Sequence, residues 1–274
     1  MAMSINTNVA SLSAQKNLSN NQKRLANSFS RLSSGFRVNT AADDAAGLAV
    51  SESMKAQIRS YDVAARNAAD GVSMAQTAEG ALGEVHSILG RMRELAMQAA
   101  NGTLSTNDRG YVDLEFSELK DEIARIQGSA EFNGVQVVGA TAQTVIFQIG
   151  LDNNSNDQIA VTFGGVALTT VLAATTGVAN VSSAQASLSR IDNAISAVSG
   201  SRASFGAAMN RLDIVGSNIE TMRLNLSAAN SRIRDVDVAA ETSRLSKNQV
   251  LSQAGVSVLA QANQLPQLAL NLLG

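Results

Sequence analysis

The sequence predicts a mainly α-helical protein: an elongated antiparallel coiled-coil rod of long helices with a small β-hairpin region. Two runs of apolar residues with heptad spacing, 51–100 and 188–233, indicate two long helices that pair through these stripes. Only 3% of the 274 residues are aromatic, with no Trp and a single Pro, a composition poorly suited to a compact globular core. Small Ala side chains occupy much of the first stripe and let helices approach closely, which favours rods and assemblies.

The two long stripes match when the helices run in opposite directions. Each stripe has one place where two three-residue steps fall together, centred on Ala75 in the first run and on Leu212 in the second. With these residues opposite each other, Met54 falls opposite Ile233, because both pairs of residue numbers sum to 287. We therefore expect an antiparallel pair in which Ala75 faces Leu212.

Both ends of the chain carry a narrow apolar stripe without a partner in the neighbouring sequence. Burial of the seven stripe side chains in residues 1–34 would contribute roughly 10–20 kcal/mol, whereas ordering about 34 backbone units costs roughly 1–2 kcal/mol each. We therefore expect terminal helices that order on assembly, with a kink or a helix end at Pro266. The expected assembly residues are Ile5, Val9, Leu12, Leu18, Leu25, Phe29, Leu32, Leu251, Ala254, Val258, Leu259, Ala262, Leu265, Leu268 and Leu272.

Local signals mark the connection between the first terminal helix and the first long helix. Gly35 is expected to end one helix, and Asn39 or Thr40 is expected to cap the next. Asp43 and Asp44 would then lie in the first turn, where the helix dipole favours carboxylates. A carboxylate pair also suits catalysis or metal binding, but the dipole explains both residues without further chemistry.

A third helix and a hairpin follow the first long helix. Ser105 and Asp108 have the spacing of a capping box and begin a predicted helix over 105–128. The apolar period then changes from 3.6 to 2 in residues 145–149 and 159–163, which predicts the two strands of a β-hairpin.

The sequence offers no set of residues for catalysis or cofactor binding. His86 is the only histidine and cysteine is absent, which excludes Ser-His-Asp, Cys-His and multi-histidine zinc sites. No glycine-rich phosphate-binding motif occurs. We expect no enzyme activity, no cofactor and no metal site.

Charge and hydropathy also limit the partners. A formal net charge of -2 gives no basic footprint for nucleic acid, so we expect no such partner. No apolar run approaches the about 18 residues of a membrane span, and the N-terminus lacks the pattern of a cleaved signal peptide. Membrane-surface binding by the terminal helices is a competing interpretation, but such helices are usually rich in Lys and Arg. Lys247 is the only charged residue after Arg244, so we expect no membrane partner.

Three stretches of the sequence resemble bacterial flagellin. They are FSRLSSGFRVNTAADDAAGLAVSESM at 29–54, RMRELAMQAANGT at 91–103, and SRIRDVDVAAETSRLSKNQVLSQAG at 231–255, the last followed by LAQANQLPQ. The likeness covers roughly residues 1–140 and 180–274. These motifs are long and specific, beyond a coincidental match of heptads.

The resemblance implies a structural subunit that polymerises into the helical flagellar filament for swimming motility. In this family the chain termini form the inner tube of the filament. Flagellins are secreted, without signal cleavage, through the flagellar type III export apparatus and add beneath a filament cap. The implied location is therefore extracellular, in the bacterial flagellum. Implied partners are other copies of the chain, cap and hook-junction proteins, and an export chaperone at the C-terminal segment, here 243–274.

The resemblance further implies recognition of the monomer by the vertebrate Toll-like receptor for flagellin. The receptor-binding residues carry over to Arg91 and Leu95 within RMRELA and to Glu115, with Arg93 and Glu94 alongside. The same surface is expected to pack against neighbouring subunits, so assembly alone also explains these residues.

The implied domains follow from the terminal and central motifs. Residues 1–42 and 235–274 would form an inner-core coiled-coil domain, and 43–234 a rod domain. The rod would contain helices 43–100, 105–128 and 183–233, and a β-hairpin and loop region at 131–181, of which residues 164–181 give no clear element and are expected to be outermost. Many flagellins insert large outer domains at this place, and this chain does not. A hook-filament junction protein is the nearest alternative function, and a secreted adhesin or membrane-active helical protein is a more distant one.

Overall fold

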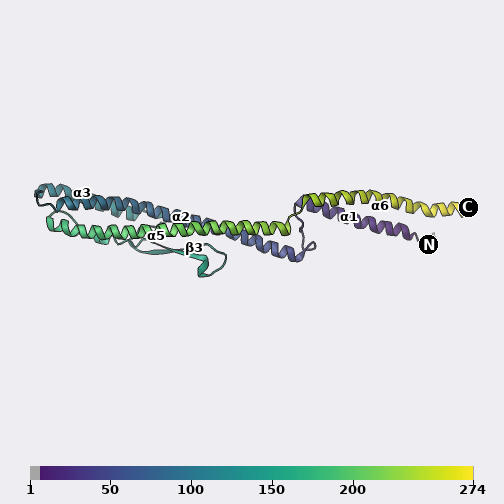
Figure 1. Ribbon diagram of the computed structural model, residues 1–274, viewed down its shortest axis with the longest axis horizontal. Coiled ribbons are helices and arrows are strands. Elements are labelled where there is room, and N and C mark those ends of the chain that lie inside the picture. Colours follow the sequence, from purple (N-terminus) through teal and green to yellow (C-terminus); the bar gives the residue numbers. More distant parts are fainter. Residues whose placement is uncertain (1–6, 274) are drawn as a thin grey trace. The chain divides into compact units, whose positions relative to one another are not determined.

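The computed structural model describes the backbone of residues 7–273 and the side chains of residues 7–264. The chain forms two compact units (Figure 1). Unit 1 consists of Met1–Ala56 together with Asn225–Gly274, and unit 2 consists of Gln57–Leu224. The predicted domains 1–42, 43–234 and 235–274 divide the chain by role in a polymer, and that division stays a prediction.

Long helices dominate both units, as the sequence predicts. Helices α2 (Ala45–Ala99) and α5 (Val181–Arg234) each contribute residues to both units. Helix α3 (Thr106–Ser129) belongs to unit 2, and α1 (Val9–Ser34) and α6 (Val238–Leu273) belong to unit 1. The mainly α-helical fold with antiparallel helices and a small hairpin region is confirmed.

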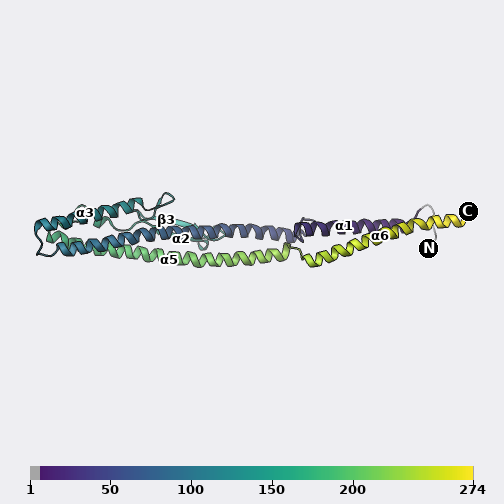
Figure 2. The same ribbon diagram turned by 90° about the horizontal axis from the view of Figure 1, so that it is seen from above.

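In unit 2, α2 and α5 lie side by side in opposite directions (Figures 1 and 2). The residue numbers of their ion pairs sum to 281 or 285, two to six below the predicted 287. The antiparallel direction is therefore confirmed, and these pairs lie away from the predicted register. Leu212 packs beside Gly71, one turn before its predicted partner Ala75, because glycine leaves room for the leucine side chain. The ion pairs are Arg93–Asp192, Glu79–Arg202 and Asp62–Arg223.

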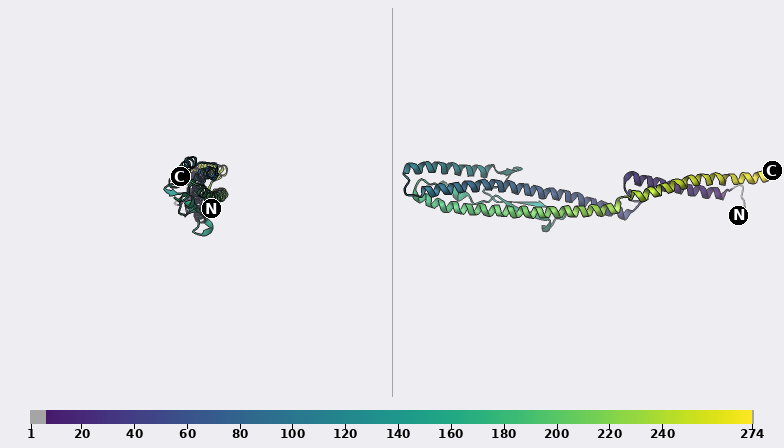
Figure 3. Two further views of the ribbon diagram at one scale, coloured as in Figure 1. Left: turned by 90° about the vertical axis from the view of Figure 1, so that its left-hand side faces the viewer. Right: turned by 45° about the horizontal axis from the view of Figure 1, so that its top comes forward.

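Helix α3 lies along the part of the α2·α5 pair that contains the C-terminal end of α2 (Figure 3). Its first turn has the predicted capping box, in which the backbone N–H of Asp108 donates to Oγ of Ser105 at 3.2 Å. Phe116 and Ile123 are buried against the helix pair. The α3 helix therefore closes one side of the core.

A buried guanidinium joins α3 to the end of α2. Arg109 is 8% exposed and donates hydrogen bonds to the carbonyl oxygens of Ala99, Asn101 and Leu104 at 2.8, 3.1 and 3.3 Å. The last carbonyls of a helix have no partner within the helix. Arg109 supplies these partners and fixes the turn between α2 and α3.

Two antiparallel hairpins follow α3. The short strands β1 (Glu131–Phe132) and β2 (Val135–Gln136) pair first, and β3 (Gln143–Gln148) pairs with β4 (Gln158–Phe163) through the loop that contains the 3-10 helix η1 (Ser155–Asp157). The second hairpin is the predicted one. Its inward residues are Phe147, Ile149, Ile159, Val161 and Phe163.

The hairpin packs on the α2·α5 pair. The ring of Phe163 stacks on that of Phe205 in α5, with centroids 5.3 Å apart. Residues 164–181, expected to be outermost, instead pack inward and include α4 (Thr169–Leu172). Their buried side chains, whose partners come from distant parts of the chain, include Val166, Leu168, Val171 and Val178.

The connection from α1 to α2 differs in part from the prediction. Gly35 ends α1 in the left-handed conformation, with φ 74°, as expected. Asn39 and Thr40 do not cap α2, because the helix begins only at Ala45. Asp44 takes that role, since its Oδ1 accepts the backbone N–H of Gly47 at 2.9 Å. Both aspartates therefore precede the first turn that was predicted to contain them.

Helix α6 continues through Pro266 to Leu273, so a helix end at this proline is wrong, and the alternative, a kink, stays a prediction. Within residues 7–273, no helix combines the length and the apolar character needed to cross a bilayer.

Candidate assembly surface

The surface expected to mediate assembly lies on α1 and α6 of unit 1. These helices run antiparallel along each other. Side-chain amides bridge them at two levels, since Nδ2 of Asn8 donates to the carbonyl of Ala262 and Nδ2 of Asn21 to that of Asn248, both at 2.7 Å. Polar Asn side chains therefore fix the alignment of the pair.

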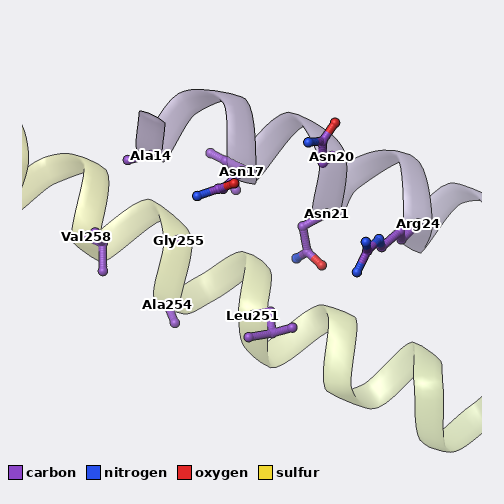
Figure 4. A pocket seen from close by; sticks show the side chains of 10 residues that line it. Ala14, Asn17, Asn20, Asn21, Arg24, Leu251, Ala254, Gly255 and Val258 are labelled. Carbon is purple, nitrogen blue, oxygen red and sulfur yellow. The ribbon is translucent and has the colours of Figure 1, made fainter. Parts of the chain in front are cut away.

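Small residues let the two helices approach each other. The side chain of Leu18 packs on Gly255, where a Cβ would lie 3.3 Å from its Cδ1. A groove of about 400 Å³ runs along this contact and has both polar and apolar walls. Figure 4 shows Asn21 and Arg24 on the side of α1 that faces α6.

Much of the predicted assembly stripe remains exposed after α1 and α6 pair. Val9, Leu12 and Phe29 are 70%, 57% and 68% exposed, and Leu251 and Val258 on α6 are also exposed. Such apolar exposure on adjacent helices is typical of a protein-protein contact surface. The remaining residues divide as follows: Ala254 is exposed, Leu18, Leu25, Leu32 and Leu259 are half-buried, Ala262 is buried, and Ile5, Leu265, Leu268 and Leu272 lie outside the described side chains.

Three further apolar residues of α6 are also exposed. Val238, Val250 and Val256 are each more than half exposed, and the heptad stripe did not include them. Heptad spacing identifies residues on one face of a helix only, whereas α6 carries apolar side chains on several faces. Counting valines outside the stripe would have found this signal.

The segment that follows α1 is bonded to the segment that precedes α6. A β-bridge joins Phe36 to Asp235, and the backbone N–H of Val236 donates to the carbonyl of Gly35 at 3.0 Å. The guanidinium of Arg234 lies 4.4 Å from the centre of the Phe36 ring, a cation–π contact. These contacts hold the end of α1 next to the start of α6.

Asp43 organises the loop that leads into α2. Its carboxylate accepts hydrogen bonds from the backbone N–H and the hydroxyl of Thr40, both at 3.0 Å, and from the backbone N–H of Asn39 at 3.3 Å. These bonds, those of Thr40 first, together with Arg31 at 3.2 Å, hold the pKa of Asp43 below its ordinary value. The predicted first-turn carboxylate is therefore a loop-closing residue.

The predicted receptor-binding residues lie on unit 2. Arg91 on α2 pairs with Glu115 on α3 at 2.8 Å and with Glu94 at 3.0 Å, and all three side chains are well exposed. Hydrogen bonds to Glu115, then Glu94, raise the pKa of Arg91, so this residue stays cationic. Arg93 pairs separately with an aspartate of α5 at 2.7 Å.

Leu95 does not share this exposure. It is 2% exposed and belongs to the core of unit 2, because α3 covers that side of α2. Leu95 therefore offers almost no surface to a partner in this structure, and its receptor-binding role stays a prediction. The described side chains also form no group of three or more His, Cys, Asp or Glu that would hold a metal ion.

Both helical portions of the chain match known family models. The bacterial flagellin N-terminal helical region matches residues 5–142, and the bacterial flagellin C-terminal helical region matches residues 188–273. The chain belongs to the bacterial flagellin family. The part of this flagellin between the two matches contains the β3–β4 hairpin and α4 and is short.

One flagellin and one flagellar filament protein are similar to this flagellin over nearly its whole length. It is 42% identical to the flagellin of Halalkalibacterium halodurans over 271 residues, 99% of this chain and 100% of that protein. It is 40% identical to the flagellar filament 30.7 kDa core protein of Treponema maltophilum over 284 residues, again 99% and 100% of the two chains. The crystal structure of Bacillus cereus flagellin aligns with a TM-score of 0.51 at 34% identity, covering 60% of this chain and 94% of that chain.

Proposed function

We propose that this flagellin is a structural subunit that polymerises through its terminal helices into the filament of a bacterial flagellum. The filament would lie outside the cell and serve swimming motility. The observation that supports this most is the apolar surface that α1 and α6 leave exposed after pairing, with Val9 and Phe29 mostly open to solvent. Other copies of the chain would cover this surface and supply the core that unit 1 lacks.

The polymer would grow because its contacts do not close. A copy that uses one surface towards the next copy and a different surface towards the previous copy generates an open helix rather than a ring. The assembly residues of α1 and α6 face solvent on several sides of the pair, which suits contacts with more than one neighbour. The function is therefore mechanical.

Protection of the same surface is needed before assembly. We propose that an export chaperone covers the C-terminal segment 243–274, which includes exposed Leu251 and Val258. The chain would then pass through the flagellar type III export apparatus and meet the cap and hook-junction proteins at its destination.

Seeded elongation tests the proposed function. Purified protein is added to sheared filaments and growth is followed by negative-stain microscopy. Wild-type protein is expected to elongate the seeds, whereas deletion of residues 1–34 is expected to abolish growth. Thermal unfolding of unit 2, followed by circular dichroism, should be unchanged by the deletion. Elongation at the wild-type rate without residues 1–34 would refute assembly through α1.

We also propose that the exposed cluster of Arg91, Glu94 and Glu115, with Arg93 alongside, binds the vertebrate Toll-like receptor for flagellin. Its support is the family resemblance of RMRELA and the exposure of these charged side chains. Leu95 would act only by supporting the helix from the core. Arg91→Ala is expected to lower receptor activation by monomer about tenfold, as for a central interface arginine.

The matched control for Arg91→Ala is Arg125→Ala on α3. Arg125 also forms an exposed ion pair, with Glu122 at 2.6 Å, but is not part of the cluster. Activation of receptor-bearing cells should be unaffected by the control. Equal responses to both variants would argue against this binding site.

Two alternatives make different predictions. A hook-filament junction protein would cap seeds and stop their growth instead of extending them. A membrane-active helical protein would float with liposomes in a density gradient. The exposed apolar side chains of α1 and α6 suit contact with other protein subunits or with lipid. The full-length similarity to a flagellin favours the filament.

A further inference from the structure

The terminal helices carry almost only positive charge. Residues 1–42 contain five Lys or Arg residues and no Asp or Glu, and no acidic residue follows Glu241, whereas Arg244 and Lys247 do. Unit 1 has ten basic and six acidic residues, and unit 2 has 11 basic and 17 acidic residues. Copies that pack their terminal helices together therefore bring like charges together.

Part of this positive charge gathers in one groove of unit 1. Arg24 and Arg31 from α1 and Arg244 and Lys247 from α6 line this groove, which has a volume of about 380 Å³. It also contains Glu241, which is 3% exposed. We call this the basic groove.

Only one half of the basic groove contains counter-ions. Arg31 pairs with Asp43 and Arg244 pairs with the buried Glu241, both at 3.2 Å. These two acidic residues balance these two cations.

The other half is not balanced. Arg24 and Lys247 line the same groove, and neither has a hydrogen bond or an ion pair with any residue whose side chain the structure describes. Their residue numbers sum to 271, close to the 269 of the hydrogen-bonded pair Asn21 and Asn248, so the two cations lie at nearly the same level of the helix pair. In the isolated chain, water solvates both exposed side chains and their repulsion is weak.

Assembly changes this balance. If neighbouring copies cover the groove, Arg24 and Lys247 lose water, and a desolvated charge needs a counter-ion. The terminal helices of a second copy have no unpaired carboxylate to offer, because Glu241 is already used. The counter-ion must therefore come from outside these helices.

We propose that the basic groove binds an oxyanion between Arg24 and Lys247 when the subunits assemble. This inference rests on the proposed polymerisation. The unbalanced charge of the two side chains suits a divalent oxyanion such as sulfate or hydrogen phosphate, and it also suits carboxylates from the acidic unit 2 of another copy. The side-chain amides of Asn27 and Asn248 line the groove and provide further donors.

The test compares the double variant R24Q/K247Q with the control K16Q/K23Q, which removes the same charge from α1 outside the groove. Seeded elongation is measured in sodium sulfate and in sodium chloride at equal ionic strength, and sedimented filaments are assayed for retained radiolabelled sulfate. General salting-out by sulfate should act equally on two variants that lose the same charge, so the comparison between them isolates the groove.

A bound free oxyanion predicts two results. Wild-type and K16Q/K23Q filaments retain about one sulfate per subunit, whereas R24Q/K247Q filaments retain none. The ratio of the elongation rate in sulfate to that in chloride is roughly threefold higher for wild type and K16Q/K23Q than for R24Q/K247Q, which needs no counter-ion. Carboxylates from another copy predict instead that no sulfate is retained and that R24Q/K247Q alone slows elongation, equally in both salts. Either result supports oxyanion binding and identifies its source.

Equal elongation of R24Q/K247Q and K16Q/K23Q in both salts, with equal sulfate retention, would overturn the inference. Failure of the proposed function looks different, because wild-type protein would then extend seeds in neither salt.

Discussion

Units 1 and 2 are both built on antiparallel helix pairs, yet only unit 2 buries a continuous apolar core. In unit 2, Leu82, Leu89 and Leu212 are fully buried. In unit 1, the buried apolar side chains among those described are Val38 and Ala262. The difference is a third layer: α3 and the β3–β4 hairpin cover the α2·α5 pair, whereas no described element covers α1·α6. A helix pair alone is too thin to exclude water from its stripes.

The two units also differ in charge, since unit 1 carries an excess of basic residues and unit 2 an excess of acidic ones. Unit 2 buries its core within the chain, whereas unit 1 leaves apolar side chains exposed that we propose other copies cover.

The largest difference in stability should come from truncating one leucine of a helix pair in each unit. Leu89→Ala leaves a cavity in the core of unit 2 and should lower the free energy of unfolding of the isolated subunit by about 3 kcal/mol. Leu12→Ala, at an exposed position of α1, should change it by less than about 0.5 kcal/mol. Urea unfolding followed by circular dichroism measures both, and equal losses would contradict the difference between the units.

A smaller loss is expected at the turn of unit 2 that Arg109 closes. Arg109→Met keeps the volume of the side chain but removes the donors to three carbonyls, and should cost about 2 kcal/mol in the same urea experiment. Arg125→Met on α3 is the control, because that side chain is exposed, and its unfolding midpoint should match wild type. If Arg109→Met also matches wild type, the turn does not depend on this guanidinium.

The smallest effect concerns pH and unit 1. The pKa of Asp43 is lowered in the folded state, so its stabilising contribution is present above the unfolded pKa of about 3.9 and is lost as the pH falls through the folded value. Filaments should therefore disassemble more readily below about pH 4, and Asp43→Asn should weaken them at neutral pH by about 1 kcal/mol per subunit.

Light scattering of filaments during acidification measures this effect. The amide that Asp43→Asn introduces cannot titrate, so the variant should show a shallower dependence on pH than wild type. Identical acid profiles would show that the loop bonds of Asp43 do not contribute.

Features set by local chemistry were predictable from the sequence. Gly35 ends α1 and Ser105 caps α3 because a left-handed residue and a capping box need only neighbouring residues. The antiparallel pairing also followed from the stripes, but its register did not, because the space beside Gly71 that admits Leu212 is a three-dimensional property.

Features set by distant contacts were missed. Leu95 resembles an exposed residue of a helix surface until α3 covers it, and Val166 and Leu168 lie in a stretch without periodicity that tertiary contacts bury. Asp44 caps α2 in place of the two predicted candidates, because Asp43 binds Asn39 and Thr40 into the preceding loop.

Hydrogen exchange of the backbone amides, measured by mass spectrometry on monomer and on filament, tests the central claim that unit 1 obtains its core from other copies. Amides of α1 and α6 should exchange rapidly in the monomer and become protected in the filament. Amides of α2 near Leu82 and Leu89 should be protected in both states. Full protection of α1 and α6 in the monomer would contradict the account.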